Sequence, residues 1–305
     1  MGNKEIKSGV IQAGFSYLLW GLLPIYWKLL GHVNAIEILA NRVFWSFVFM
    51  LALLVFSGKF GAFLGVLKEF KAQRKQIYAL SIASVLISGN WGVYIWAVNT
   101  GQMVEASMGY YINPLVSVLL GMIVLKEKLT KAQYVSFALA FIGVIIISLS
   151  YGRFPWIALT LAFTFGFYGL AKKLIKVDSS IGLTLETMAV TPIALAYLIL
   201  MLIKGTSAYL HTDIGTHLLL AGAGVVTALP LLFFANGAQK IPLSMLGFLQ
   251  YIAPTLSLML GIFVYGEQFS GLQLLAFIFI WSALTLYSLS KTRLFAAVGV
   301  RMRNH

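Results

Sequence analysis

Ten apolar segments follow one another along the chain, and each is about as long as a helix must be to cross a membrane. A helix needs about 20 mainly apolar residues to span roughly 30 Å of hydrocarbon. Unpaired backbone N–H and C=O groups are costly in lipid, so such segments form helices rather than open strands. We therefore predict an all-α membrane protein with ten transmembrane helices. The predicted spans are 9–29, 35–57, 77–98, 103–125, 131–150, 154–174, 181–203, 215–235, 243–265 and 271–290.

The composition excludes a water-soluble protein of this size. Of the 305 residues, 60% are hydrophobic and 10% are charged, whereas soluble domains have about 45–50% apolar and about 25% charged residues. The chain has no cysteine, which excludes disulfides, thiolate metal sites and cysteine nucleophiles. The net charge of +13 does not indicate nucleic-acid binding, because the basic residues lie in short loops between apolar runs.

The basic residues predict the orientation of the chain, because cytoplasmic loops carry an excess of Lys and Arg. With a cytoplasmic N-terminus, eighteen Lys and Arg lie inside, three lie outside, and Arg42 lies within a span. The inside group includes a predicted loop after span 6 with Lys172, Lys173 and Lys176. We expect both termini in the cytoplasm and a multi-pass location in a bacterial-type inner (plasma) membrane.

Segments outside the spans carry further predictions. Lys4 and Lys7 precede the first apolar run as in a signal peptide, but no Ala-x-Ala-like site follows, so we expect a retained first span. Residues 58–76 place apolar side chains at helical spacing among Lys and Arg, which predicts an amphipathic helix on an anionic membrane face. The basic C-terminal tail is expected to lie there too; it carries Lys291, Arg293, Arg301 and Arg303.

Two stretches of the chain resemble each other. ASMGYYINPLVSVLLGMIVLKEKL around span 4 is similar to LSMLGFLQYIAPTLSLMLGIFVYGEQF around span 9. More weakly, LLWGLLPIYWK (18–28) parallels FTFGFYGLAKK (163–173), sharing a glycine and a closing lysine. The residues that recur 140 positions later around span 9 are Tyr111, Ile112, Pro114, Ser117, Gly121 and Glu127.

The repeat predicts two halves of opposite orientation. Each half holds five spans, an odd number, so the second copy inserts upside down relative to the first. Inverted repeats related by an axis in the membrane plane are typical of secondary transporters, whose halves rock around a midplane site. We predict a first five-helix repeat over 1–150 and an inverted second repeat, with a basic cytoplasmic tail, over 151–305.

The same residues resemble a known family. Trp20-Gly21, the segment EILANRVFW (37–45) and the Gly…Glu ends of spans 4 and 9 resemble the EamA family of the drug/metabolite transporter superfamily. GYYINPLVSVLLG and LGFLQYIAPTL look most like its RarD-type branch. The resemblance covers nearly the whole chain. It implies export of amino acids, metabolites or drugs through a central cavity between the halves, with spans 5 and 10 peripheral, but it names no substrate.

Charged residues at membrane depth are costly, so each needs a physical reason. Glu37, near one end of span 2, is read as a solvated acid, as a structural ion-pair or hydrogen-bonding group, or as a substrate-binding or proton-coupling site. Asn41 lies on the same helical face. Arg42 is deeper and stays charged, so it needs a carboxylate, a carbonyl or an anionic ligand.

Polar and aromatic groups on spans 3, 4 and 9 suit an amphiphilic small solute. Interhelical hydrogen bonding and packing are the alternative for each of them. Proline frees the carbonyl four residues earlier, as at Pro114 and Pro254, and such breaks commonly line transporter cavities. With Asn41 and Arg42, the candidate substrate-binding residues are Trp20, Asn90, Trp91, Tyr94, Tyr110, Asn113, Gln250 and Tyr251.

Three further acids lie near span ends or in the second half. Glu186 on span 7 is a candidate proton-coupling acid, with a hydrogen-bonded structural acid as the alternative. Glu127 and Glu267, at the ends of spans 4 and 9, are read as helix-end, topology or inter-repeat contacts. Glu37 and Glu186 are thus the two predicted coupling acids.

Other function classes lack their usual motifs. There is no paired-acid diphosphate motif, no His-Glu-x-x-His, no Gly-x-Ser-x-Gly and no nucleotide-binding Gly-x-x-x-x-Gly-Lys loop, so we expect neither an enzyme nor an ATP-driven pump, and no catalytic residue, metal or cofactor. A channel, or a sensor or structural membrane protein, is the alternative to a carrier. The expected partners are a small-molecule substrate and the lipid bilayer, and the oligomeric state stays open between a monomer and a homodimer.

Overall fold

The computed structural model describes residues 3–68, 74–100, 102–150, 152, 154–264 and 271–290. Within these residues it is helical and contains no strand. The predicted Glu267 and the basic tail lie outside the described residues. The helices are α1 (Asn3–Leu29), α2 (Ala35–Phe56), α3 (Phe60–Lys68), α4 (Arg74–Asn99), α5 (Met103–Ile123), α6 (Lys131–Ser150), α7 (Trp156–Leu174), α8 (Ser179–Ile203), α9 (Ala208–His211), α10 (Ile214–Lys240), α11 (Leu243–Gln250), α12 (Ile252–Phe263) and α13 (Gly271–Ser290).

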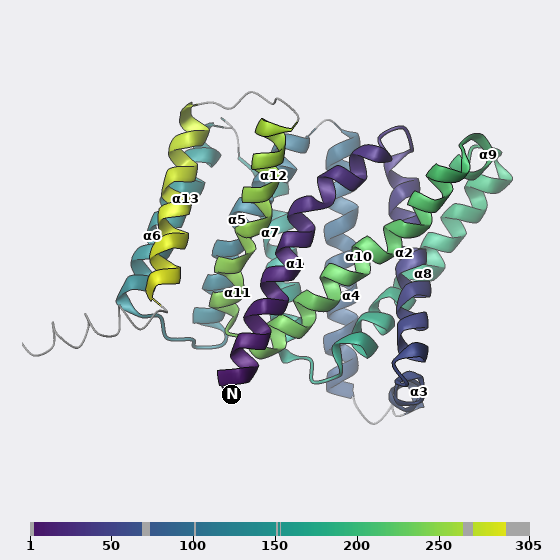
Figure 1. Ribbon diagram of the computed structural model, residues 1–305, viewed down its shortest axis with the longest axis horizontal. Coiled ribbons are helices and arrows are strands. Elements are labelled where there is room, and N and C mark those ends of the chain that lie inside the picture. The colour runs from purple at the N-terminus through teal and green to yellow at the C-terminus, as the bar shows by residue number, and fades with distance from the viewer. Residues whose placement is uncertain are drawn as a thin grey trace, which may run out of the picture.

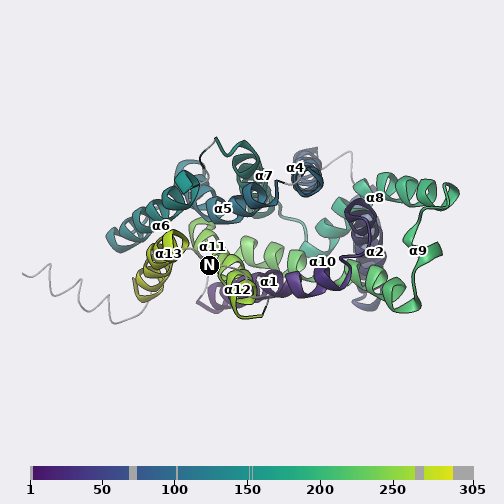
Figure 2. The same cartoon turned by 90° about the horizontal axis from the view of Figure 1, so that it is seen from above.

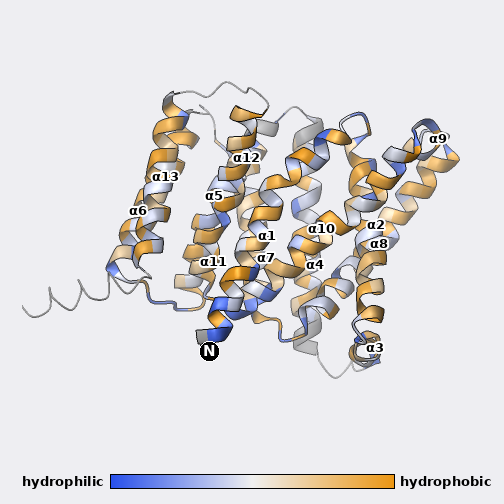
Figure 3. Cartoon of the chain, viewed as in Figure 1, coloured by the Kyte–Doolittle hydropathy of each residue, from blue (hydrophilic) through white to orange (hydrophobic). Residues whose placement is uncertain are grey.

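Nine stretches of the described residues are long and apolar enough to cross a membrane. They coincide with nine of the ten predicted spans, and the remaining predicted span, 77–98, lies within α4. Hydrophobic residues predominate along the helices, while hydrophilic residues gather toward the upper and lower edges (Figure 3). Many large apolar side chains face outward, as expected where lipid is the solvent. The protein is therefore a multi-pass, all-α membrane protein.

The helices form two layers with a helix pair at each end. Seen from above, α4, α5 and α7 lie on one side and α1, α10 and α12 on the other (Figure 2). The pair α6 and α13 packs together at one end, and the pair α2 and α8 at the other (Figure 1). Between the ends, α1 packs on α10 and α12, while α7 packs on α4 and α5.

Two glycines allow close approach of the helices at corresponding places in the two layers. A Cβ on Gly21 of α1 would lie 2.7 Å from Leu256 Cβ in α12. A Cβ on Gly166 of α7 would lie 2.7 Å from Val116 Cγ1 in α5. Small residues at such crossings let helix backbones pack closely, which is how membrane helices gain van der Waals contact.

The two proline-containing segments of the predicted repeat behave differently. Helix α5 continues through Pro114, whereas the predicted ninth span is interrupted at Tyr251, between α11 and α12. A Cβ on Gly247 of α11 would lie 2.7 Å from the carbonyl oxygen of Pro114. The side chain of Glu127 accepts hydrogen bonds from the backbone N–H groups of Leu243 and Ser244 at 2.7 and 2.9 Å. It thus caps α11, a contact that agrees with the helix-end and inter-repeat readings of Glu127.

The loop predicted after span 6 begins later than expected. Lys172 and Lys173 belong to the last turn of α7, and Lys172 is only 1% exposed. The prediction that Lys172 is a loop residue was therefore wrong, because a Lys-Lys pair after an apolar run has the same sequence signature whether it ends a helix or leaves it. In the connection 58–76, residues 60–68 form the short helix α3.

Candidate functional site

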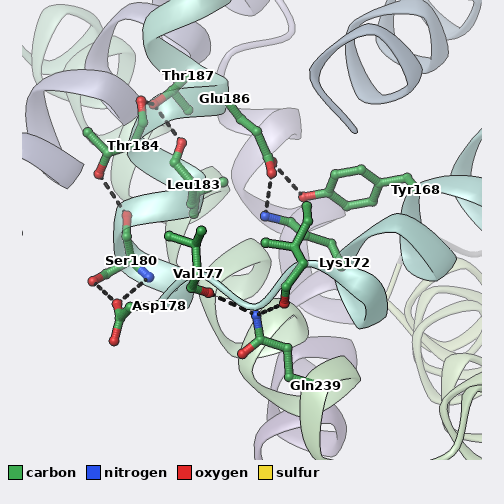
Figure 4. A network of polar contacts seen from close by, with 11 residues as sticks. Tyr168, Lys172, Val177, Asp178, Ser180, Leu183, Thr184, Glu186, Thr187 and Gln239 are labelled. Atoms are coloured by element: carbon green, nitrogen blue, oxygen red, sulfur yellow. Dashed lines mark hydrogen bonds and ion pairs between the residues drawn. The ribbon is translucent and has the colours of Figure 1, made fainter. Parts of the chain in front are cut away.

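A buried ion pair joins α7 and α8. The Lys172 ammonium lies 2.6 Å from Glu186 Oε1, and both side chains are 2% exposed. The Tyr168 hydroxyl donates to the other carboxylate oxygen at 3.2 Å (Figure 4). Burying two charges is expensive unless they are paired and further hydrogen-bonded, and here both conditions are met. The pair locks the end of α7 to the first part of α8.

Further polar contacts fix the loop between α7 and α8. The Gln239 amide of α10 donates to the carbonyl oxygens of Ile175 and Val177 at 3.1 and 3.2 Å (Figure 4). Asp178 caps α8 by accepting from the Ser180 N–H at 2.9 Å, and its other oxygen lies 2.7 Å from the Lys59 ammonium. These bonds connect α10, the loop and the start of α3 along one edge of the molecule.

The electrostatics of Asp178 follow from these contacts. Partial burial raises the pKa of this carboxyl, but the hydrogen bonds from Lys59 and Ser180 and the nearby Lys59 charge outweigh it. The net effect is a pKa below the usual value of 3.8. Both partners of the ion pair remain more than two-fifths exposed, so the pair contributes little to stability at neutral pH.

A narrow cavity adjoins Glu186. It lies between α2, α4, α7, α8 and α10, with Glu186 and Thr187 as its polar residues beside the indole of Trp91 and the ring of Tyr168. Its remaining lining is aliphatic, from Val43, Ile87, Leu183, Val190 and Leu231. Its interior volume is about 10 Å³, which is room for about one water molecule, so in this conformation the cavity is too small for a solute.

Arg42 of α2 lies close to the Trp91 ring, which lines this cavity. Its guanidinium carbon is 5.6 Å from the centroid of the Trp91 ring and 4.6 Å from that of the Trp27 ring. Its Nε donates to the Thr227 hydroxyl of α10 at 3.0 Å. Tyr94 and Tyr110 lie within electrostatic range of the same guanidinium. A cation at this depth costs roughly 2.5–3.5 kcal/mol, which aromatic faces offset in part.

The structure therefore brings four predicted site residues together. Arg42, Trp91, Tyr94 and Tyr110 come from α2, α4 and α5, and the Tyr94 and Tyr110 rings pack edge-to-face with centroids 6.3 Å apart. Sequence reasoning missed Trp27, Thr227 and Lys172 as neighbours of the site. A signal for two of them was present, since Trp27 and Lys172 hold the same position in the two similar segments 18–28 and 163–173.

Glu37 and Asn41 make structural contacts. Glu37 is 3% exposed, and its Oε1 accepts from the Ser207 hydroxyl and the Ala208 N–H, each at 2.8 Å. Asn41 accepts from the Tyr209 hydroxyl at 2.7 Å. These bonds tie α2 to the segment around α9. Glu37 therefore makes the hydrogen bonds expected of a structural group, and its burial does not fit a solvated acid.

The remaining predicted residues lie apart from Arg42. The Asn90 amide donates to Leu161 O and to the Thr164 hydroxyl of α7, each at 2.9 Å, which is interhelical hydrogen bonding. Trp20 packs in an aromatic cluster with Tyr17, Phe165 and Phe234.

The last group lies where α11 crosses α5. The Gln250 amide donates to Asn113 Oδ1 at 3.4 Å. Tyr251, which is 1% exposed, has a hydroxyl without a hydrogen-bond partner among the described residues. This polar group joins the two predicted repeats through their proline segments. In the described part of the chain, no group of three His, Asp or Glu residues is arranged to hold a metal ion.

Comparison with protein families identifies one match over almost the whole chain. The model of the EamA-like transporter family matches twice, over residues 7–149 and 155–289. A Bacillus subtilis protein named "Uncharacterized transporter YojE" is 51% identical over 96% of this chain and 97% of its own length. "Protein RarD" of Escherichia coli is 42% identical over 94% of this chain and 96% of its own.

A more distant relative and a solved structure extend this comparison. "Chloramphenicol-sensitive protein RarD" of Pseudomonas aeruginosa is 27% identical over 94% of this chain and 95% of its own. One crystal structure, 19% identical, superposes with a TM-score of 0.72 over 94% of this chain and 99% of the other. At that identity the superposition shows a shared fold.

Proposed function

Because the chain belongs to the EamA-like transporter family and is a membrane transporter, we propose that it is a secondary carrier for a small metabolite, amino-acid-like or drug-like solute. The two halves, 1–150 and 151–305, form inverted repeats of five spans each. They rock around a shared central site, so that the site opens to the two sides of the membrane in turn. The direction of net transport is outward.

The observation that carries this proposal is the pair of matched glycine contacts. Gly21 meets Leu256, and Gly166 meets Val116. Gly21 and Gly166 are 145 positions apart, and Val116 and Leu256 are 140 apart, which are the offsets of the two similar segment pairs. The same contact therefore occurs once in each layer, with the roles of the halves exchanged. Two chance similarities between apolar helices would not produce reciprocal packing.

The arrangement of the helices supports the same symmetry. Exchanging the halves replaces α1, α10 and α12 by α7, α4 and α5, which are the two layers seen in Figure 2. The exchange turns each end pair into itself, because α2 is exchanged with its own partner α8, and α6 with its own partner α13. The family model likewise matches once in each half.

The charged groups supply a way to close one side. Arg42 is the eighth residue of α2, and Glu186 is the eighth residue of α8. Each helix is capped by the residue that directly precedes it, Asn34 for α2 and Asp178 for α8. In the proposed repeat, Trp27 of the first half corresponds to Lys172 of the second, and Arg42 corresponds to Glu186. The second pair is closed and buried, whereas Arg42 is only partly buried. We interpret this asymmetry as one side shut and the other side accessible.

Glu186 is the better placed of the two predicted coupling acids. It borders the cavity beside Trp91, while Glu37 is engaged in the contact with Ser207 and Ala208. Protonation of Glu186 would remove the ion pair with Lys172 and loosen the closure between α7 and α8. One proton moving down 100 mV supplies roughly 2.3 kcal/mol, enough to drive outward solute transport by proton antiport.

The location follows from charge and family. The excess of Lys and Arg in one set of loops supports cytoplasmic termini in the inner membrane. In that orientation the edge with Lys172 and Asp178 faces the cytoplasm, and Arg42 is reached from outside. The name of the Pseudomonas relative includes chloramphenicol sensitivity, which makes chloramphenicol a compound to test.

Solute counterflow in proteoliposomes tests the proposal. Purified protein is reconstituted and screened with a panel of metabolites, amino acids and chloramphenicol, with and without a pH gradient. We expect saturable counterflow of at least one solute that a pH gradient accelerates. Conductance steps in planar bilayers would indicate a channel, and a complete lack of counterflow across the panel would contradict the carrier.

A further inference from the structure

Arg42 has a defined set of neighbours that leaves most of its donors unused. Among the described residues its side chain makes one hydrogen bond, from Nε to the Thr227 hydroxyl at 3.0 Å. The guanidinium lies near two indole rings, with distances of 4.6 Å to Trp27 and 5.6 Å to Trp91. The two terminal Nη groups make no hydrogen bond to a described residue. A guanidinium presents these groups as a planar fork that fits a carboxylate with two parallel bonds.

No described carboxylate forms an ion pair with Arg42. Glu186 is bound to Lys172 and Asp178 to Lys59. Glu37, one turn before Arg42, accepts from Ser207 and Ala208. The acids at 105, 127 and 213 accept from helix-end N–H groups elsewhere in the fold. An arginine at membrane depth that has no counter-ion among the described residues indicates a place for an anion from outside the chain.

The surroundings of Arg42 limit what kind of anion fits. Tyr94 and Tyr110 lie in its electrostatic neighbourhood, and Tyr110 is 53% exposed although it is large and aromatic. Aromatic walls favour an apolar body next to the negative group. One fixed positive charge matches one negative charge, which favours a carboxylate over a doubly charged phosphate.

We propose that Arg42, Trp27 and Trp91 form the binding site for the carboxylate of an organic anion whose apolar body lies against Tyr94 and Tyr110. This inference rests on the proposed carrier function and names its substrate class. A lipid phosphate or free phosphate shares the anionic chemistry, and the experiment separates these sources from a solute carboxylate.

The test is titration calorimetry on delipidated protein in a neutral detergent. Phenylpropanoate serves as the carboxylate probe, and phenylpropanamide serves as its neutral counterpart of nearly the same shape. Inorganic phosphate and a short-chain phosphatidic acid represent the other anion sources. We expect the carboxylate to bind about 10- to 100-fold more tightly than the amide, as a charge-assisted bidentate contact requires.

Variants assign the preference to Arg42. Arg42→Gln should remove the preference for the carboxylate and leave the weak binding of the amide unchanged, and Arg42→Lys should retain part of it. Lys204→Gln is the matched control, because it removes one exposed positive charge from the same side of the molecule without touching the site. If Arg42→Gln does not fold, the two probes are compared on the unaltered protein and on Arg42→Lys. A smaller preference for the carboxylate in Arg42→Lys then supports the site, and an unchanged preference contradicts it.

Three outcomes would overturn the proposal. These are equal binding of acid and amide, a preference that survives Arg42→Gln, and tighter binding of either phosphate compound than of the carboxylate. Failure here is distinguishable from failure of the carrier function. Counterflow of an uncharged solute without carboxylate binding would refute this site alone, whereas selective carboxylate binding without any counterflow would refute transport alone.

Discussion

At the scale of single residues, the two charged groups near Trp91, Arg42 and Glu186, differ in how their charge is satisfied. Glu186 has a cationic partner 2.6 Å away and a hydroxyl donor from Tyr168. Arg42 has two aromatic faces and one hydroxyl. The first arrangement stabilises a closed contact between α7 and α8, and the second leaves donors for a ligand.

The buried pair should show strong coupling in a double-mutant cycle. Lys172→Met or Glu186→Leu alone leaves one buried charge without its partner, and each should cost roughly 3–5 kcal/mol. The double variant Lys172→Met/Glu186→Leu should cost much less than the sum. Thermal unfolding in detergent measures each variant. Additive losses would contradict a direct ion pair.

The Asp178–Lys59 contact should respond to acid. The folded-state pKa of Asp178 lies below its usual 3.8, so its contribution is present at pH values above the usual pKa and is lost as the pH falls through the lower folded-state pKa. We expect Asp178→Asn to change the melting temperature little, with a difference that begins to shrink near pH 3.8 and disappears only below the lower folded-state pKa.

The size of this acid effect should be small. An exposed pair contributes at most about 1 kcal/mol, and asparagine can still cap α8. Melting temperatures of both proteins between pH 3 and pH 7 check the prediction, with Lys59→Gln as the partner control. A difference that grows as the pH falls would show that Asp178 is destabilising.

At the scale of helices, the two glycine crossings set how closely the layers pack. Gly21→Ala and Gly166→Ala should each destabilise the protein, by about 1–3 kcal/mol, because the new methyl meets a side chain at 2.7 Å. Gly21→Ala should cost more, since its neighbours include Leu256 Cβ and the carbonyl oxygen of Ala253. Gly14→Ala on α1 is the control, because nothing lies within 4 Å of its Cβ position. Equal stability of all three variants would remove the packing argument.

The contact of Glu37 with the α9 segment gives a second prediction at this scale. Glu37→Gln keeps an oxygen that can accept from Ser207 and Ala208, so the fold and the pH dependence of flux should both persist. Glu37→Leu leaves both donors unpaired in a buried place and should cost about 1–3 kcal/mol. Stability and proteoliposome flux at several pH values are the measurements. Loss of pH-dependent flux in Glu37→Gln would make Glu37 a coupling acid after all.

At the scale of the whole molecule, the sequence predicts the elements better than the site. Span ends agree with helix ends to within a few residues because lipid imposes a long apolar run on each helix. The depth of Lys172 could not be predicted, since its burial depends on Glu186, which comes from another helix. The neighbours of Arg42 were only partly foreseeable: Trp91, Tyr94 and Tyr110 were polar or aromatic residues on spans, while Thr227 has no sequence signal and depends on how α10 crosses α2.

The role of a polar residue within a span could not be predicted from its type. Asn90, Asn113 and Gln250 hold helices together through hydrogen bonds, and such contacts look the same in sequence as ligand-binding amides. Packing alone distinguishes them from Arg42. We propose that the two halves alternate, so that the Lys172–Glu186 side and the Arg42 side are never open together.

Thiol labelling can test this alternation, because the chain has no cysteine of its own. Thr187→Cys reports on the cavity beside Glu186, and Tyr110→Cys reports on the surroundings of Arg42. Each single-cysteine protein is labelled with a membrane-impermeant thiol reagent in oriented vesicles, with and without a transported solute. Alternation predicts that solute changes the two labelling rates in opposite directions and from opposite sides of the membrane. Rates that rise and fall together, or that never respond to any solute, would contradict it.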